Sequence, residues 1–187
     1  MDPSVTIAAA VPADAEAIAA IYAHHVEHGN ASYEIAPPTA EEMAARMARA
    51  EAAGWPWLAA RALRQAQDGP ESEVVGYAYV TQFRDRSAYR YVCENSIYIR
   101  DDRRGEGLGR ALLALLIVAA ERAGFRQMIA VIGGAEPASE RLHAACGFVT
   151  AGRLTGIGRK HAQWLDTLYM QRALGQGDAT PPEVEPE

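Results

Sequence analysis

The sequence predicts one α+β domain built around a single mixed sheet. Three observations support this prediction. The chain has 187 residues, which suits one domain with a substantial core. Segments with the alternation of strands are interspersed with segments whose apolar residues recur at helical spacing. A central stretch, 94–124, combines a strand, a glycine-rich turn and a helix, and the rest of the chain is organised around it.

The elements before the central stretch are a strand, two helices and a hairpin. Apolar periodicity defines them, and turn residues mark their ends. Thr39 and Glu42 form a capping box that begins the second helix. Asp68-Gly69-Pro70 is a turn signal, so the hairpin is expected to have a long loop, 65–72. The strands are expected at 5–11, 57–63 and 74–81, and the helices at 12–28 and 39–53.

The elements from the central stretch onward are four strands and two helices. A polar and basic segment, 82–91, enters the central strand, and a loop with Gly and Lys residues, 155–163, joins the last two strands. The segment 175–187 is rich in Pro and Glu and is expected to be disordered. The strands are expected at 96–99, 128–132, 149–154 and 164–172, and the helices at 110–123 and 137–145.

The central stretch predicts a phosphate-binding loop. Three glycines, Gly105, Gly107 and Gly109, let the backbone turn and approach a ligand closely. The helix that follows presents free backbone N–H groups to an anion. The spacing fits neither a P-loop nor a dinucleotide-binding fingerprint, but Arg104 completes the pattern R-x-x-G-x-G. An ordinary glycine-rich turn before a buried helix is the alternative.

Composition excludes several classes of function. The net charge of −6 argues against a nucleic-acid-binding protein, which would carry a basic surface. Two cysteines, Cys93 and Cys146, are too few for a disulfide framework or a metal-ligand cluster. We therefore expect no metal, and we expect the protein to lie in the reducing cytoplasm. The N-terminus has no signal-peptide pattern, and the apolar run 111–120 is too short to span a bilayer. We therefore expect no membrane partner.

Five segments together carry a resemblance to a known family. They are R-x-x-G-x-G, R-D-R-S-A-Y-R-Y-V-C-E-N-S-I-Y-I, A-V-I-G-G, R-L-H-A-A-C-G-F and G-R-K-H-A-Q-W-L-D. Over residues 5–174 the chain resembles the GNAT superfamily of N-acetyltransferases, and within it the enzymes that act on phosphinothricin, methionine sulfone and methionine sulfoximine. The resemblance implies the GNAT fold, a mostly antiparallel mixed sheet flanked by helices, as a single domain, 1–174, with a disordered tail, 175–187. It also implies acetyl-CoA as co-substrate and a homodimer.

The resemblance assigns catalytic and cofactor-binding residues. Glu94 takes the position of the general base, and His143 that of the group that protonates the leaving thiolate. The alternatives are a salt bridge from Glu94 to Arg86 or Arg90, and a capping or packing role for His143. The expected acetyl-CoA contacts are Ile97, Tyr98, Ile99, Arg104, Gly105, Glu106, Gly107, Leu108, Gly109, Arg110, Glu136 and Ser139.

The acceptor is expected to contact two segments. The resemblance places substrate contacts at Arg84, Arg86 and Tyr89, and an arginine pair suits a carboxylate or phosphinate. Tyr33 lies in the loop that lines the substrate side, next to Glu34. A solvated basic loop is the alternative for 82–91, and no role is assigned to Lys160, His161 or Trp164.

Two residues depart from the family pattern or raise an alternative mechanism. Glu136 stands where the family usually has an asparagine that bonds the pantetheine arm, and a carboxylate cannot donate as an amide does. Cys146 could form an acyl-enzyme, although a cysteine in this setting is more often a small core residue.

The function expected from these features is acetyl transfer to the α-amine of a small amino-acid-like acid. The amine would attack acetyl-CoA directly in a ternary complex. Two alternatives stay open: an acetyltransferase for other small amines or a protein N-terminus, and a CoA-binding sensor without turnover.

Overall fold

The computed structural model describes residues 4–66 and 69–185 and contains one seven-stranded sheet in the order β1-β2-β3-β4-β5-β7-β6. Every neighbouring pair of strands is antiparallel except β4 and β5, which are parallel. The strands are β1 (Val5–Ala9), β2 (Trp57–Ala66), β3 (Gly69–Gln82), β4 (Val92–Ile99), β5 (Gln127–Gly133), β6 (Val149–Lys160) and β7 (Gln163–Ala173). The helices are α1 (Ala15–His28), α2 (Ala40–Ala52), α3 (Leu108–Arg122) and α4 (Pro137–Ala145). The predicted fold class and order of elements are confirmed.

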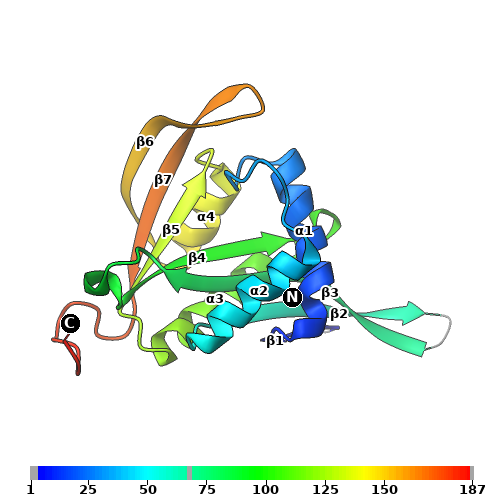
Figure 1. Ribbon diagram of the computed structural model, residues 1–187, viewed down its shortest axis with the longest axis horizontal. Helices are drawn as coiled ribbons and strands as arrows, with labels where there is room; N and C mark the ends of the chain where they lie inside the picture. Colours follow the sequence, from blue (N-terminus) through cyan, green and yellow to red (C-terminus); the bar gives the residue numbers. More distant parts are fainter. Residues whose placement is uncertain (1–3, 67–68, 186–187) are drawn as a thin grey trace.

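Helices cover both faces of the sheet (Figure 1). On one face α1 and α2 pack on β2, β3 and β4 through a cluster that includes Ile18, Met43 and Tyr77. On the other face α3 lies against the same strands through Leu112, Leu116 and their neighbours. Only one face of α3 is buried in this way, because Leu115 and Val118 on its outer face are 46% and 43% exposed.

The sheet opens between β4 and β5. The parallel pairing runs from Val92 opposite Gln127 to Asn95 opposite Ala130. Beyond that point β4 continues beside β3, and β5 continues beside β7. The two strands therefore diverge in the middle of the sheet, and residues 96–98 of β4 line a cleft there. The Ile99 carbonyl lies 2.9 Å from Nε2 of His25.

Two loop predictions were wrong. The expected loop 65–72 is largely strand, because β2 and β3 stay paired as far as Ala66 opposite Gly69. Likewise, most of the expected loop 155–163 belongs to β6, whose register shifts between Leu154 and Gly158. The hairpin turns at His161 and Ala162, with φ of 49° and 60°, the left-handed pair typical of a two-residue hairpin loop. Apolar patterning could not show these extensions, because β6 is almost entirely exposed.

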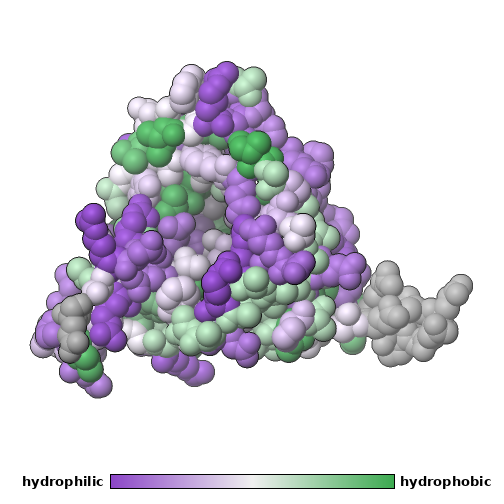
Figure 2. Space-filling model, viewed as in Figure 1, coloured by the Kyte–Doolittle hydropathy of each residue, from purple (hydrophilic) through white to green (hydrophobic). Residues whose placement is uncertain are grey.

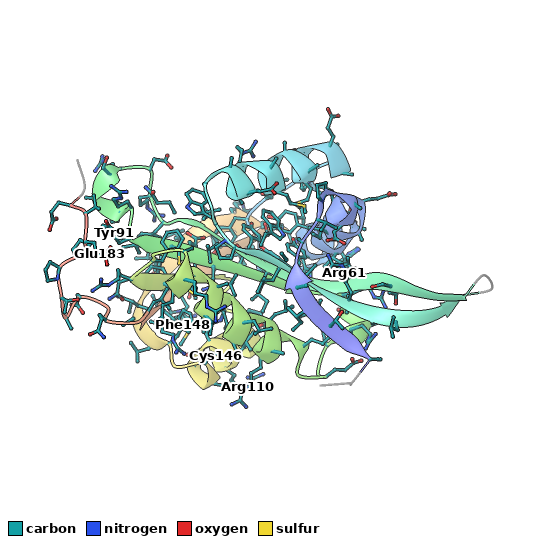
Figure 3. All side chains as sticks on the ribbon, turned by 90° about the horizontal axis from the view of Figure 1, so that it is seen from below. Arg61, Tyr91, Arg110, Cys146, Phe148 and Glu183 are labelled. Carbon is teal, nitrogen blue, oxygen red and sulfur yellow. The ribbon has the colours of Figure 1, made fainter. Side chains whose placement is uncertain are left out.

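The C-terminal segment lies against the body of the domain. The composition of 175–187 predicts disorder. In the structure, however, residues 177–184 accept hydrogen bonds from the side chains of Arg126 and Tyr91. Arg126 donates to the carbonyls of Gly177 and Thr180, at 2.8 Å each, and the Tyr91 hydroxyl donates to the Val184 carbonyl. Figure 3 shows Tyr91 next to Glu183 at this end of the molecule. None of the described helices is long and apolar enough to cross a membrane.

Candidate active site

The cleft between β4 and β5 is lined by four of the expected site residues, Ile97, Tyr98, Ser139 and His143. It is a small cavity of about 50 Å³. Figure 2 shows the molecule hollowed on the face where β6, β7 and α1 surround this opening. Its lining comes from β4, β5, α4 and the α1–α2 loop: Ala31, Asn95, Ser96, Ile97, Tyr98, Ala130, Val131, Ile132, Gly133, Ser139 and His143.

The backbone of β4 along this cleft is suited to pairing with an extended ligand. The side chains of Ile97 and Ile99 pack on the α3 core, and Tyr98 packs on the α1–α2 core. Both sets of side chains are thus engaged in the fold, and the backbone edge faces the cleft. This is the arrangement expected for a pantetheine arm that adds to the sheet like a strand.

The glycine-rich loop forms the N-terminus of α3, as predicted. Gly105 and Gly107 both have φ of 81°, a left-handed conformation that favours glycine, and Gly107 is the N-cap residue directly before α3. Gly109 serves a different purpose, since a Cβ there would lie 3.3 Å from Leu142 of α4. The loop therefore combines two turn glycines that precede α3 with one packing glycine in the first turn of the helix.

The charged side chains of this loop are held by one another. Nε of Arg103 donates to both carboxylate oxygens of Glu106, at 3.0 and 2.9 Å, so Glu106 orients a basic residue of the loop. Arg104 lies 3.2 Å from Asp101 and approaches Nδ1 of His25 at 3.5 Å. Leu108 is buried beneath the loop and anchors it. The exposed Arg110 follows on the first turn of α3, where Figure 3 shows it near Cys146 and Phe148.

Glu94 lies on β4 directly opposite Thr81 of β3. It alternates with Cys93 and Asn95, so it faces the α1–α2 side of the sheet, the side of Tyr98. Burial raises the pKa of its carboxyl above the usual value, and the guanidinium of Arg84 opposes that shift. Among the described residues no hydrogen bond or ion pair joins Glu94 to Arg86 or Arg90. A half-buried carboxyl with a raised pKa is the type of group that acts as a general base near neutral pH.

His143 is buried on α4, with both ring nitrogens in contact with polar atoms. Nδ1 lies 2.8 Å from the Ser139 carbonyl, and Nε2 lies 3.0 Å from Oδ1 of Asn95. The ring meets Phe148 edge to face at 5.0 Å. Burial lowers the pKa of the imidazole, and the bond to Ser139 opposes that effect. The ring is rigidly placed in the cleft wall.

Glu136 caps α4. Its side chain accepts a hydrogen bond of 2.8 Å from the backbone N–H of Ser139, so the carboxylate occupies the helix N-terminus. This explains how the helix accommodates an acidic residue where the family has asparagine. The expected donor to the pantetheine arm is thereby replaced by a charged helix cap.

The three residues of the basic loop that are expected to bind the acceptor substrate lie directly before β4. Arg84 lies over the Phe83 ring, 4.0 Å from its centre, and donates to the Phe83 carbonyl at 2.7 Å. Tyr89 meets the same ring edge to face at 5.9 Å. Arg86 is exposed. Phe83 therefore orders the loop. The guanidinium of Arg84 lowers the pKa of Glu94, so the charge of this loop acts on the expected base.

Tyr33 fixes the loop on the opposite side of the cleft. Its hydroxyl donates to the Asp166 carbonyl at 2.8 Å and lies 2.7 Å from the Thr167 hydroxyl. Gly158 makes room for the ring, since a Cβ there would lie 2.7 Å from it. Tyr33 thus joins the α1–α2 loop to the β6–β7 hairpin, and its ring is partly exposed.

A polar network that no sequence pattern indicates lies beside Tyr33. Glu34 accepts from Arg46 at 2.7 Å and from the Tyr22 hydroxyl at 3.0 Å. Lys160, which had no assigned role, is buried and donates to the Ser32 carbonyl at 2.7 Å. These contacts join residues 12 to 128 positions apart, so no local pattern could have revealed them.

Asn95 is the other residue that the sequence analysis missed. It is buried, contacts His143, and donates from Nδ2 to the Ile129 carbonyl at 3.1 Å. Strand alternation contains the relevant signal, because the neighbour of Glu94 must point to the opposite face of the sheet.

Comparison with known proteins agrees with this geometry. The model of the GNAT acetyltransferase domain matches residues 7–169. The chain belongs to this family of acetyltransferases. Its expected class, an acetyl-CoA-dependent N-acetyltransferase, is confirmed.

Within this family, the chain is similar to several individual N-acetyltransferases. It is 50% identical over 171 residues to a phosphinothricin N-acetyltransferase of Alcaligenes faecalis, covering 91% of this chain and 83% of the relative. It is 33% identical to a methionine sulfoximine and methionine sulfone acetyltransferase of Salmonella typhimurium, over 92% and 96% of the two chains. A crystal structure of a phosphinothricin acetyltransferase of Sinorhizobium meliloti with acetyl-CoA superposes with a TM-score of 0.89. That structure shares 45% identity and covers 98% of this chain and 95% of its own.

Proposed function

We propose that this enzyme transfers the acetyl group of acetyl-CoA to the α-amine of a small amino-acid-like acid, of the phosphinothricin, methionine sulfone or methionine sulfoximine type. The observation that carries the proposal is the position of Glu94. This carboxyl of raised pKa lies on the cleft strand, within the electrostatic influence of Arg84 of the basic loop. A base and a cationic loop together suit an acceptor that carries both an ammonium and an acid group.

The cofactor in this proposal lies along β4 and at the N-terminus of α3. The pantetheine arm pairs with the backbone of 97–99, and the pyrophosphate lies on the amides from Gly105 to Arg110. Arg104 and Arg110 supply positive charge there. Holding the thioester in one orientation supplies a large part of the rate, since intramolecular positioning can replace much of the entropic cost of the reaction.

The proton transfers in this proposal are divided between two residues. Glu94 takes the proton of the attacking amine, directly or through water, while the new C–N bond forms. The C–S bond then breaks, and His143 gives a proton to the departing thiolate. Solvent returns a proton from Glu94 to His143. The products are the N-acetylated acid and free CoA, with no acyl-enzyme on Cys146. Burial raises the pKa of the Cys146 thiol and keeps it a poor nucleophile.

The acid group of the acceptor is assigned to Arg84, Arg86 and Tyr89. Arginine favours bidentate contact with carboxylates and phosphinates, and the order that Phe83 gives this loop reduces the cost of binding. Tyr33 forms the opposite wall together with the hairpin that it secures.

Steady-state kinetics with matched acceptors test this assignment. Methionine sulfone is compared with its carboxamide, which has the same side chain and amine but no anion. Arg84→Ala with Arg86→Ala should raise the KM for the acid by at least tenfold and leave that for the amide unchanged. Arg122→Ala, an exposed arginine at the far end of α3, is the control. Equal use of acid and amide by the unaltered enzyme would favour the alternative of a general amine or N-terminal acetyltransferase.

Two further expectations remain predictions, the homodimer implied by the resemblance and the cytoplasmic location expected from the two cysteines. We propose that the enzyme is a homodimer and that it acts in the cytoplasm. Analytical ultracentrifugation of the full chain would test the first, with a mass near twice the 20.2 kDa of one chain expected.

A further inference from the structure

The imidazole of His143 lies between two groups that can only accept hydrogen bonds. On one side is the backbone carbonyl of Ser139, at 2.8 Å from Nδ1. On the other is Oδ1 of Asn95, at 3.0 Å from Nε2. A neutral imidazole has one N–H, so it can satisfy only one of these two acceptors.

The orientation of the Asn95 amide is set from its other end. Nδ2 donates to the Ile129 carbonyl at 3.1 Å, and a carbonyl accepts only. Rotating the amide would give His143 a donor but would bring Oδ1 against the Ile129 oxygen. The mismatch would then move to the point where β4 and β5 separate. The hydrogen-bond pattern therefore keeps Oδ1 toward the imidazole.

The remaining neutral arrangement also leaves a conflict. If the single proton is on Nε2, then Nδ1 can accept from the Ser139 hydroxyl at 3.4 Å. It would still present its lone pair to the Ser139 carbonyl at 2.8 Å. Only the imidazolium, with both nitrogens protonated, satisfies every contact of the Ile129–Asn95–His143–Ser139 chain.

Resting on the proposed function, we propose that Asn95 is a positioning residue that holds a proton on Nε2 of His143, and that this is the proton delivered to the thiolate. Asn95 acts through the imidazole and does not itself touch the reacting atoms. The position of His143 in the wall of the cleft, beside Ser96 and Ile97, places the charged ring along the path of the thioester arm.

No charged side chain among the described residues competes for this proton. The carboxylate of Glu136, on the same helix, caps the Ser139 N–H, and Glu140 and Arg141 are exposed. On β4, Glu94 faces the opposite side of the sheet. Burial raises the pKa of the Cys93 thiol to about 12, so this neighbour of Asn95 stays neutral. The Phe148 ring that covers the imidazole is uncharged.

The first test measures the protonation of His143 without any turnover. The full chain, which has five histidines, is labelled with ¹⁵N at histidine, and His143→Gln identifies the signals of this ring. Asn95→Leu removes the acceptor at similar volume, and Asn95→Asp replaces it with a charged acceptor. The midpoint of the His143 titration should fall by about 0.5 to 1 unit in Asn95→Leu, the size expected for one hydrogen bond, and should rise in Asn95→Asp.

The second test asks whether this proton is used in catalysis. The basic limb of the kcat–pH profile should move down in pH for Asn95→Leu and up for Asn95→Asp, while the Kd for acetyl-CoA stays constant. If Asn95 served packing alone, the two substitutions would not shift the basic limb in opposite directions. Melting curves of both variants show whether each remains folded.

The outcomes separate this inference from the proposed function. The role of Asn95 is refuted if the unaltered protein and both variants have the same titration midpoint for His143. It is also refuted if these midpoints differ but the basic limb of the kcat–pH profile does not move, even in an active enzyme. If either variant fails to fold, ¹⁵N shifts of the unaltered protein decide. A neutral form with its proton on Nδ1 above the midpoint supports the inference, because the proton lost is then the one that Asn95 holds on Nε2. A neutral form protonated on Nε2 overturns it, because that ring releases its Nδ1 proton first. Absence of turnover with every acceptor would instead refute the proposed function.

Discussion

Replacing Glu94 by glutamine preserves the shape of the side chain and removes its basicity. The structure places this carboxyl on β4, half-buried, with no hydrogen bond or ion pair to another described side chain that glutamine would break. We expect kcat/KM at pH 7 to fall by about 10²- to 10⁴-fold, the usual range for loss of a general base. This corresponds to about 3 to 5 kcal/mol of transition-state stabilisation.

Two pH dependences make the prediction sharper. The rate loss should shrink as the pH rises from about 6 to 10, because the acceptor amine is then increasingly neutral without help. Stability should respond in the opposite sense to that of a salt bridge. Because burial raises the pKa of Glu94 in the folded protein, its contribution to stability is complete below the unfolded pKa and is lost as the pH rises through the folded value. At pH 7 and above, Glu94→Gln should therefore have an unchanged or higher Tm.

The assay combines pH-dependent kinetics, followed by thiol release, with melting curves and acetyl-CoA titration. Glu51→Gln, an exposed carboxylate at the end of α2, serves as the matched control and should behave as the unaltered enzyme. A lower Tm together with a rate defect that does not depend on pH would identify Glu94 as a structural ion-pair partner. A wild-type rate at neutral pH would also exclude Glu94 as the general base.

Three further substitutions test the other parts of the site. Gly107→Ala should weaken acetyl-CoA binding measured by calorimetry. Gly54→Ala is the control, because Gly54 has a similar φ of 70° and equally open surroundings. Both variants should lose about 1–2 kcal/mol of stability, but Gly54→Ala should bind acetyl-CoA normally. If the two variants bind acetyl-CoA with equal affinity, the loop is an ordinary turn. Glu136→Asn should retain the helix cap within about 0.5 kcal/mol and tighten acetyl-CoA binding at the same time, and weaker binding would contradict the account of this position. Cys146→Ala should keep the kcat of the unaltered enzyme, whereas loss of turnover in a folded variant would restore the acyl-cysteine mechanism.

The sequence was sufficient for the elements that have strong local patterns. The apolar run of α3, the capping residue Thr39 and the glycines at 105 and 107 each appear where periodicity and backbone chemistry placed them. The order of elements followed from the same signals. The β6 strand was underestimated because it lies at the edge of the sheet with few buried side chains, so it has little alternation to detect.

The site was predictable only where it depends on position along one strand or loop. Glu94 and His143 could be proposed because they stand at fixed places in recognisable motifs. The contact between His143 and Asn95 spans 48 residues and depends on how α4 docks on β4, which no local pattern encodes. The Glu34–Arg46 pair and the burial of Lys160 likewise depend on the packing of the α1–α2 loop. The cap made by Glu136 shows that a departure from a family motif acquires its meaning only from the local geometry.

The most direct test of the account is a turnover measurement with the full chain, acetyl-CoA and either phosphinothricin or methionine sulfone. Released thiol and the N-acetylated acid are quantified together, the first by a thiol reagent and the second by mass spectrometry. We expect equal amounts of the two products, with the acetyl group on the α-amine. Acetyl-CoA binding without product from any amine would contradict it and identify a CoA-binding protein without turnover.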